Sequence, residues 1–307
     1  MKKNILITGV SGFIGRCTLK EFLSCSDDFK IYALVREPLE LPESVIQLLC
    51  EDISKVEDVS IPCNIDVVIH LAAKAHIKEA SASIEEFRLI NRDATDKLLK
   101  KCTEIGVRRF IFLSTIGVLG NVTEGVPLNE ESDEQPRSMY AISKLEAEHA
   151  VKAYCQDSGI EYVIIRPPLV IGFDAPGNIG SLIKFIKWKL PLPVLSVRNK
   201  RSFIFCANLS HFIFVCSSNE LARNETFVVS DTPALSTADL IKLLASGIDK
   251  KPLLFSVPIW LLRFTLFIFQ KQGIYTQLCG SLEVDSSKAK NLLNWKPPFD
   301  LYGRPQR

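Results

Sequence analysis

A tyrosine and a lysine four residues apart, Tyr140 and Lys144, have the residue types and the spacing for acid–base chemistry. A helix-favouring run follows them, and residues four apart lie on one helix face, so the phenol and the ammonium are expected to project to the same side. A free tyrosine has a pKa of about 10. A lysine charge close by in a dry site stabilises the phenolate, so the pair predicts a Tyr140 pKa lowered towards neutral. The alternative is an exposed helix on which both side chains are solvated.

Two hydroxyl residues lie upstream of this pair, at the end of an apolar run. Residues 109–115 read R-F-I-F-L-S-T, which predicts a buried strand that delivers Ser114 and Thr115 to the carboxyl edge of a sheet. Open α/β sheets bind their ligands at that edge. Either hydroxyl could orient a substrate oxygen beside Tyr140. The candidate catalytic residues are therefore Thr115, Tyr140, Lys144 and the adjacent Ser114.

Three glycines follow the first predicted strand, residues 4–8. The segment G-V-S-G-F-I-G at 9–15 leads into a run with helical periodicity. Glycines at such a junction permit a tight turn and let a pyrophosphate approach the helix N-terminus, where backbone amides and the helix dipole favour an anion. The motif predicts dinucleotide binding. The expected contacts are Gly9, Ser11, Gly12, Phe13, Ile14 and Gly15.

The ends of later elements are expected to complete the cofactor site. The second predicted strand, residues 30–35, ends in Arg36, and an arginine there suits a 2′-phosphate, which favours NADP slightly over NAD. The alternative is a solvated Arg36 beside the adenine. His70 is interpreted as a packed strand residue. The other expected cofactor contacts are Asp52, Ile53, Leu71, Ala72, Ala73, Asn91 and Pro167, together with Tyr140 and Lys144.

Alternating apolar strands and amphipathic helices predict an α/β fold: a Rossmann-type doubly wound parallel sheet with a small mixed C-terminal substrate-binding region. The dinucleotide-binding domain is expected to span 1–174, with parts of the later chain returning to it, and the substrate cap 175–307. Further expected elements are helices over 81–104 and 179–190, a basic loop over 191–202, a strand over 227–230, and a helix capped by Ser236.

Composition indicates an ordinary globular protein with a substantial core. The chain has 307 residues, 47% of them hydrophobic, and a net charge of +2, with no basic run that would indicate a nucleic-acid partner. The N-terminal apolar run is too short for a signal peptide. Nine cysteines without a C-x-x-C pair favour reduced thiols, no metal site and a cytoplasmic location.

One strongly apolar segment, residues 253–269, tests that interpretation. Pro258 and Arg263 interrupt it and leave a helix of about 11 residues, whereas a membrane span needs roughly 20. The first expectation is a buried helix. Peripheral contact with a membrane is the second, and an integral span is disfavoured.

The segments T-G-V-S-G-F-I-G, H-L-A-A, S-T-I-G-V-L-G and Y-A-I-S-K occur here in an order and spacing that resemble the extended short-chain dehydrogenase/reductase family, the NAD-dependent epimerase/dehydratases. Within it, the chain resembles nucleotide-sugar 4-epimerases and 4-ketoreductases of surface-polysaccharide synthesis. The resemblance implies Thr115, Tyr140 and Lys144 as the catalytic set, with Thr115 and Tyr140 also on the sugar, and Arg201 on the nucleotide diphosphate. It also implies a homodimer through the helices around 81–104 and 138–156.

Several positions depart from the family pattern. Ile116 and Gly117 stand where the dehydratase branch carries an Asp-Glu pair, which disfavours 4,6-dehydration. Leu169 replaces an asparagine that touches substrate in galactose epimerases, which speaks against an ordinary UDP-glucose/UDP-galactose assignment. Gln277 stands where relatives often place a second arginine, which weakens the expected diphosphate clamp.

The leading hypothesis is an NADPH-dependent 4-ketoreductase acting on a UDP-linked 2-acetamido-2,6-dideoxy-4-hexulose, with a quinovosamine-type product for O-antigen or capsule, hence for lipopolysaccharide biosynthesis. The close alternative is a UDP-glucose or UDP-N-acetylglucosamine 4-epimerase with tightly bound NAD. Both use the same three residues, and Arg36 favours the reductase. A non-catalytic NADP-binding sensor is the third hypothesis.

Overall fold

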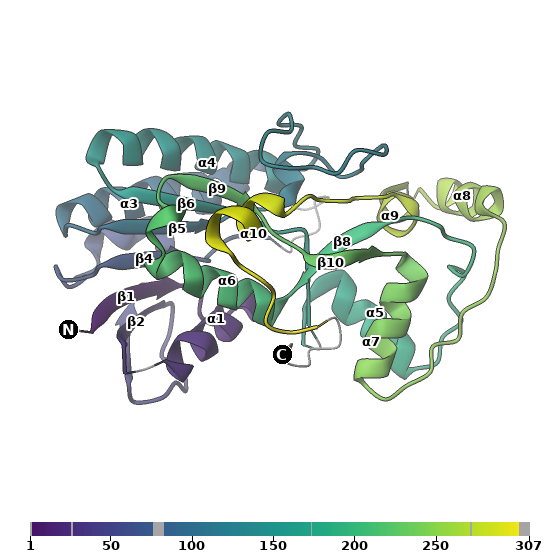
Figure 1. Ribbon diagram of the computed structural model, residues 1–307, viewed down its shortest axis with the longest axis horizontal. Coiled ribbons are helices and arrows are strands. Elements are labelled where there is room, and N and C mark those ends of the chain that lie inside the picture. The colour runs from purple at the N-terminus through teal and green to yellow at the C-terminus, as the bar shows by residue number, and fades with distance from the viewer. Residues whose placement is uncertain (1, 26, 76–82, 173, 271, 301–307) are drawn as a thin grey trace.

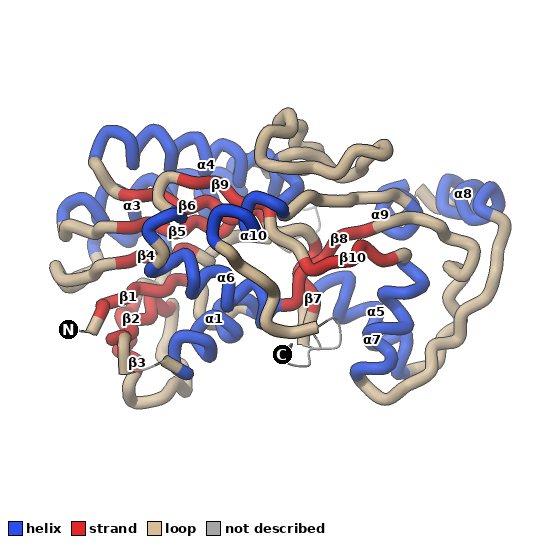
Figure 2. The backbone as a smooth tube through the Cα atoms, in the orientation of Figure 1, coloured by secondary structure: helices blue, strands red, loops and turns tan. Residues whose placement is uncertain are grey.

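The computed structural model describes residues 2–300 except 26, 76–82, 173 and 271. A parallel sheet with helices on both faces forms one part of the molecule, and a smaller sheet with its own helices lies beyond the carboxyl ends of the first (Figure 1 and Figure 2). The predicted doubly wound sheet with a small mixed region is confirmed.

The large sheet has seven strands in the order β3-β2-β1-β4-β5-β6-β9, and every neighbouring pair is parallel. The strand order reverses between β1 and β4, and α/β sheets bind ligands at such a switch point. The strands are β1 (Lys3–Thr8), β2 (Phe29–Val35), β3 (Val45–Leu49), β4 (Val67–His70), β5 (Arg109–Leu113), β6 (Glu161–Arg166) and β9 (Glu225–Val228).

Helices bury both faces of this sheet, which explains why its central strands are almost continuously apolar. Successive strand side chains point to opposite faces, so Ile5 and Ile7 pack into one core cluster while Leu6 packs into the other. The first face is covered by α1 (Phe13–Ser24), α6 (Cys206–Ser218) and α10 (Ser287–Leu293), and the second by α3 (Ala94–Glu104) and α4 (Met139–Ser158).

Short helical turns connect these elements. The predicted helix over 81–104 is α2, a π-helical turn and α3 in succession, and its first two residues lie outside the described residues. The turns are η1 (Ile53–Asp58), α2 (Ile84–Arg88), η3 (Leu89–Asp93), η4 (Ile116–Val118) and η5 (Glu220–Ala222).

The second sheet has three strands in the order β10-β8-β7, with β8 antiparallel to β10 and parallel to β7. Its strands are β7 (Leu169–Ile171), β8 (Arg201–Phe205) and β10 (Asp231–Leu235), and its helices are α5 (Gly177–Lys187), α7 (Thr237–Gly247), α8 (Ile259–Ile268) and α9 (Gln272–Cys279). Ser236 caps α7 as predicted, since its Oγ accepts a hydrogen bond from the Asp239 amide at 3.1 Å.

The expected burial of the helix after Pro258 is wrong. In α8 only Leu262 is buried, at 7% exposure, and Leu266 is half-buried, while the remaining side chains of the helix are exposed. The reason is that α8 lies at the far end of the molecule and contacts its neighbours along one edge only (Figure 1). Within the part of the chain that the structure describes, no helix has the length and apolarity to cross a bilayer.

Candidate active site

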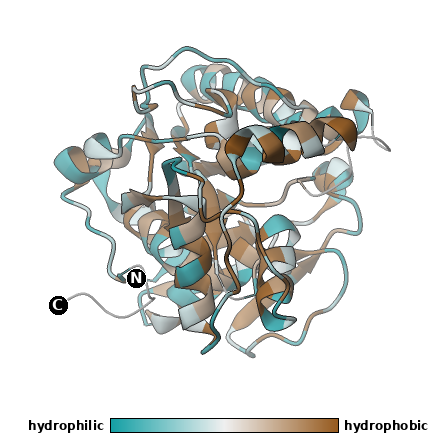
Figure 3. Ribbon diagram, turned by 90° about the vertical axis from the view of Figure 1, so that its right-hand side faces the viewer, coloured by the Kyte–Doolittle hydropathy of each residue, from teal (hydrophilic) through white to brown (hydrophobic). Residues whose placement is uncertain are grey.

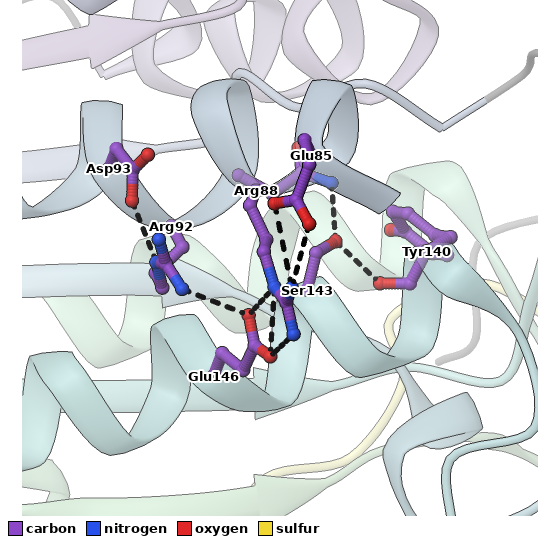
Figure 4. Close-up of polar contacts among 8 residues, drawn as sticks. Glu85, Arg88, Arg92, Asp93, Tyr140, Ser143 and Glu146 are labelled. Carbon is purple, nitrogen blue, oxygen red and sulfur yellow. Dashed lines mark hydrogen bonds and ion pairs between the residues drawn. The ribbon is translucent and has the colours of Figure 1, made fainter. Parts of the chain in front are cut away.

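Ser138 caps helix α4 and sets the residue at which the helix begins. The Ser138 Oγ accepts a hydrogen bond from the Ala141 amide at 3.1 Å, which satisfies an amide at the helix start. Tyr140 therefore falls in the first turn and Lys144 one turn later on the same side. The Ser143 hydroxyl donates to the Tyr140 carbonyl at 2.9 Å (Figure 4), so the turn that carries the phenol is held firmly.

The turn after β5 lies against the first turn of α4. The Ser114 amide donates to the Ile165 carbonyl and the Ile116 amide to the Pro167 carbonyl, at 2.8 and 2.9 Å. A Cβ added to Gly117 would lie 3.4 Å from the Thr115 Oγ1 and 3.5 Å from the Ala141 Cβ. The structure thus brings Thr115, Pro167 and the Tyr140 turn together at the carboxyl edge of the sheet.

Both hydroxyls on this turn retain hydrogen-bonding capacity. The Thr115 Oγ1 accepts from the Gly117 amide at 3.1 Å, and no described residue accepts its hydrogen. The Ser114 Oγ is buried and has no hydrogen-bond partner among the described residues. Buried polar atoms are normally paired, so an unpaired hydroxyl at this edge suits an oxygen of a ligand.

Lys144 is fully buried, and its Nζ lies 3.8 Å from the centroid of the Phe112 ring. Burial lowers the pKa of Lys144 to about 7, while the Glu148 carboxylate acts in the opposite direction. Burial also raises the pKa of Tyr140 to about 12. The expected acidic phenol is therefore wrong for the protein alone, because loss of water around the phenol disfavours the phenolate.

A buried ion pair one turn beyond Lys144 was missed by the sequence reasoning. The Arg166 guanidinium, at the end of β6, donates to both carboxylate oxygens of Glu148, with an Nη2–Oε2 distance of 2.6 Å. The Glu148 carboxyl group is close enough to Lys144 to raise the pKa of that lysine, against the effect of burial. The signal was present, since residues 140, 144 and 148 share one helix face, but the partner on β6 is visible only in the fold.

His70 is a packed residue, as interpreted from the sequence. Its Nδ1 lies 2.8 Å from the Thr8 Oγ1 and its Nε2 lies 3.0 Å from the Thr95 Oγ1. Burial, with a smaller contribution from Lys144, lowers the pKa of His70 to about 3, so the ring is neutral. The Thr8 hydroxyl also accepts from the Leu71 and Ala72 amides, at 3.2 and 3.1 Å. This network fixes the chain that passes over the glycine turn.

The glycine turn fits the backbone approach that a dinucleotide requires. Gly9 has a φ of +74°, and a Cβ added to Gly15 would lie 2.0 Å from the Gly9 carbonyl oxygen. Only glycine therefore permits this packing of turn against helix. Ser11 and Gly12 are exposed at the N-terminus of the 12-residue helix α1, where amide donors are available to a phosphate.

Two residues beside these glycines face the protein interior. A Cβ added to Gly172 would lie 2.7 Å from the Phe13 ring, so Phe13 packs on the end of β7. Ile14 is half-buried against the first core cluster. Their predicted cofactor contacts stay predictions.

The expected adenosine side lies at the ends of β2 and β3. Arg36 and Asp52 are exposed there, and Ile53 is half-buried. The Asp52 carboxylate accepts from the Ser54 amide at 2.9 Å, and this bond holds the pKa of Asp52 below its usual value. Leu71 and Ala72 are half-buried and Ala73 is exposed beyond β4. Contact of these residues with a nucleotide stays a prediction.

Asn91 is buried in the π-helical turn η3 and ties three segments together. Its Nδ2 donates to the Ser143 Oγ at 2.9 Å and to the Lys74 carbonyl at 3.1 Å, and its Oδ1 accepts from the Lys74 amide at 2.8 Å. Both amide hydrogens are used within the protein, which makes Asn91 a positioning residue for α4. Close by, Arg88 and Arg92 both pair with Glu146 of α4 (Figure 4).

Arg201 begins β8, in the second sheet. Its guanidinium is half-buried and donates to the Gly280 carbonyl at 2.9 Å. No described carboxylate forms an ion pair with it, and burial lowers its pKa. A half-buried cation without an acidic partner suits an anionic ligand. No cluster of His, Cys, Asp and Glu suited to a metal ion occurs in the described ranges.

Comparison with known proteins agrees with this geometry. The sequence profile of the NAD dependent epimerase/dehydratase family matches residues 5–230. The UDP-glucose 4-epimerase of Vibrio cholerae is 37% identical over 98% of this chain and 93% of its own length. The N-acetyl-alpha-D-glucosaminyl-diphospho-ditrans,octacis-undecaprenol 4-epimerase of Escherichia coli O157:H7 is 26% identical, over 82% of this chain and 74% of that protein.

Solved structures agree on the fold. The UDP-N-acetylglucosamine 4-epimerase of Bacillus cereus superposes with a TM-score of 0.77 at 22% identity, covering 98% of this chain and 93% of that one. The family match spans most of the chain, and the glycine turn, the Thr115 turn and the start of α4 occupy one edge of one sheet. The chain is therefore a short-chain dehydrogenase/reductase enzyme and belongs to the NAD-dependent epimerase/dehydratase family.

Proposed function

We propose that this protein is a UDP-sugar 4-epimerase that works with bound NAD. The observation that carries the proposal is the 37% identity with the Vibrio cholerae UDP-glucose 4-epimerase along nearly all of both chains. The arrangement of Thr115, Tyr140 and Lys144 at the carboxyl edge of the sheet supplies the groups that such a reaction needs.

In this mechanism Tyr140 exchanges a proton with the sugar C4 hydroxyl, and the Thr115 hydroxyl orients the same oxygen. Lys144 in its ammonium form stabilises the phenolate. Glu148 favours the charged form of Lys144, and the hydrogen bonds from Arg166 hold the Glu148 carboxyl group in place. NAD, held at the glycine turn of residues 9–15, would supply the acceptor for the C4 hydride and the donor of that hydride to the opposite face of the 4-keto sugar once the sugar has turned. A cationic ring near the phenol would oppose the effect of burial on the pKa of Tyr140.

In this proposal the dinucleotide and the UDP-sugar bind mainly to different regions of the chain. We assign the dinucleotide to residues 1–174 with the returning strand β9, and the UDP-sugar to the region 175–307. Arg201 is the candidate cation for the sugar nucleotide diphosphate, because guanidinium and phosphate pair in a bidentate manner. Ile116 and Gly117, in η4, carry no carboxyl group that could assist 4,6-dehydration.

A 4-ketoreductase is the second candidate, and Arg36 is the observation that favours it. Arg36 is exposed directly after β2, at the strand end where a 2′-phosphate would be recognised. An exchangeable NADPH suits net reduction of a 4-keto sugar such as a 2-acetamido-2,6-dideoxy-4-hexulose, whereas an epimerase retains its nucleotide.

Identification of the bound nucleotide separates the two. The purified protein is denatured and the released nucleotide identified by mass, and the native protein is then incubated with UDP-glucose and with UDP-N-acetylglucosamine. Stoichiometric NAD and interconversion of C4 epimers support the epimerase. An empty site with NADPH consumption on a 4-keto sugar supports the reductase, and absence of both activities would favour a nucleotide-binding sensor.

The polyprenyl-diphosphate form of N-acetylglucosamine is included as a third substrate, because the Escherichia coli relative is named for it. It shares the sugar and the diphosphate with UDP-N-acetylglucosamine and lacks the uridine. If the protein prefers the lipid-linked compound, the proposed substrate becomes a diphosphate-linked sugar in place of a UDP-sugar. The proposed chemistry at C4 stays the same.

A further inference from the structure

Helix α8 has apolar residues on faces that do not contact the rest of the molecule. Helices that are apolar all round are normally buried. Here only Leu262 and Leu266, four residues apart, face the core of the second region. Trp260, Phe264 and Phe267 are 70%, 56% and 63% exposed. They recur at intervals of four and three residues, so they form one stripe along the outside of the helix.

A second segment extends this apolar face. The Leu192 amide donates to the Leu253 carbonyl and the Phe255 amide to the Leu192 carbonyl, at 2.9 and 3.1 Å. These bonds join the chain after α5 to the chain that leads into α8. We call the exposed apolar side chains of residues 185–195 and 253–274 the distal surface. It holds two thirds of the exposed large apolar side chains among the described residues. Figure 3 shows α8 in brown across this end of the molecule.

Charge distinguishes this surface from the rest of the protein. Residues 175–219 and 250–282 contain ten Lys or Arg and no Asp or Glu, in a chain whose net charge is only +2. Six of these cations are exposed in or directly beside the segments that carry the distal surface, and none forms an ion pair with a described residue: Lys184, Lys187, Lys189, Lys250, Lys251 and Arg263.

We propose that the distal surface docks this protein on an anionic phospholipid bilayer, with α8 lying in the plane of the headgroups. Helix α8 presents exposed Trp and Phe side chains and one cation, Arg263, and the other exposed cations lie on the segments next to it. Exposed aromatic side chains beside cations suit the headgroup region of a bilayer. Two of the three tryptophans, Trp188 and Trp260, are exposed here, and indole rings favour the headgroup level of a bilayer. The cations are complementary to anionic headgroups. The proposal concerns attachment only and does not depend on the reaction that the enzyme catalyses.

Vesicle co-sedimentation tests the proposal directly. The full-length protein is expected to bind vesicles that contain about 30 mol% phosphatidylglycerol in phosphatidylcholine and to bind pure phosphatidylcholine much more weakly. Binding is expected to weaken about tenfold or more at high salt, because salt screens the headgroup charge. Equal binding to both vesicles, or no binding to either at low salt, would overturn the proposal.

Two sets of variants assign the binding to residues. Trp260→Ser with Phe264→Ser and Phe267→Ser is expected to weaken binding about tenfold or more. Lys250→Gln with Lys251→Gln and Arg263→Gln is expected to weaken it about a hundredfold, since each cation near such a surface contributes about fivefold. The matched controls are exposed residues outside the distal surface: Leu49→Ser, Val126→Ser and Leu221→Ser for the apolar set, and Lys20→Gln, Lys55→Gln and Lys100→Gln for the charged set.

Equal loss in a control set would overturn the assignment to the distal surface. Tryptophan emission gives a second readout, because Trp188 and Trp260 are exposed while Trp295 is 2% exposed. A blue shift on adding phosphatidylglycerol vesicles, reduced in Trp260→Phe, is the expected result. Light scattering completes the test. If the solution mass of the protein halves in the apolar variant set, the surface belongs to a second copy of the chain and the lipid proposal is wrong.

Discussion

The two regions of the molecule use apolar and charged residues in opposite ways. Around the large sheet, apolar runs lie inside and the two buried arginines are paired: Arg166 with Glu148, and Arg109 with Glu161 and the Cys216 carbonyl. The buried Lys144 lies against the Phe112 ring instead. At the distal surface, aromatic residues lie outside, and the six exposed cations in or directly beside it have no acidic partner among the described residues. Burial is expected to fix groups for chemistry in the first region, and exposure to serve attachment in the second.

The largest effect should come from Tyr140→Phe. If chemistry resides at the edge of the large sheet, this change removes the proton-transfer group and lowers turnover by a factor of about 10²–10⁴. C4 interconversion of a UDP-sugar is measured, with Tyr162→Phe on β6 as the control that retains turnover. The serine set at the distal surface should also retain turnover on a water-soluble substrate. A loss below tenfold for Tyr140→Phe would show that another residue moves the proton.

Glu148→Gln tests how much the buried ion pair between Glu148 and Arg166 contributes to stability. It leaves the buried Arg166 guanidinium with only the more distant Glu134 carboxylate, at 3.7 Å, and breaking a buried pair costs about 3–5 kcal/mol of the free energy of unfolding. Urea unfolding measures the change. The control is Glu146→Gln on the same helix, where the pair with Arg88 is partly exposed and should contribute less than about 1 kcal/mol. Equal losses in the two variants would remove the distinction between buried and surface pairs.

Comparing the stability of the wild type with that of Lys144→Met at several pH values measures how far burial lowers the pKa of Lys144. The pKa of Lys144 is lowered to about 7 in the folded protein, against about 10.4 in an unfolded chain. Between these values the unfolded chain binds the proton and the folded protein does not. Wild-type stability relative to Lys144→Met should therefore rise with pH across this window, by at most about 1.4 kcal/mol per pH unit, and be constant below it.

Unfolding of both proteins over that pH range, in matched buffers, checks this prediction. A difference that does not depend on pH would mean that Lys144 stays fully charged in the fold. Burial would then not govern the pKa of Lys144, and the positive charge near Tyr140 would be larger than a pKa of about 7 implies.

The smallest effect should come from the distal surface. Trp260→Ser is expected to change the free energy of unfolding by less than about 0.5 kcal/mol, because the side chain contacts little of the protein. The buried neighbour Leu262→Ala should cost about 2–5 kcal/mol, since it leaves a cavity. Urea unfolding of both separates the two faces of α8. A large loss for Trp260→Ser would show that the exposed face has a partner within the chain.

The features that local patterns encode were predictable from the sequence. The glycine turn, the Ser114–Thr115 strand end and the Tyr140–Lys144 spacing each depend on residues a few positions apart, and all lie at the expected edge of the sheet. What depends on neighbours distant in sequence was not predictable. The pairing of Glu148 with Arg166 requires that β6 lie beside α4. The pKa of Tyr140 depends on how much water the surrounding elements remove.

The error at α8 has the same origin. Residues 259–268 are apolar enough for a core, and hydropathy alone predicts burial wherever a packing partner exists. The partner is a property of the whole fold. His70 was interpreted correctly for a local reason, since it ends an apolar strand, but its hydrogen bonds to Thr8 and Thr95 come from two other elements.

The seventh strand has a consequence for how the chain folds during synthesis. β9 pairs with β6 after an excursion through the second sheet, and Val163 aligns with Glu225. A ribosome-bound chain that ends before residue 225 leaves the edge of β6 unpaired, and such an edge recruits strands from other molecules. Contacts between segments so distant in sequence also slow folding. Nascent chains of this protein are therefore expected to need chaperone protection until β9 has emerged from the ribosome.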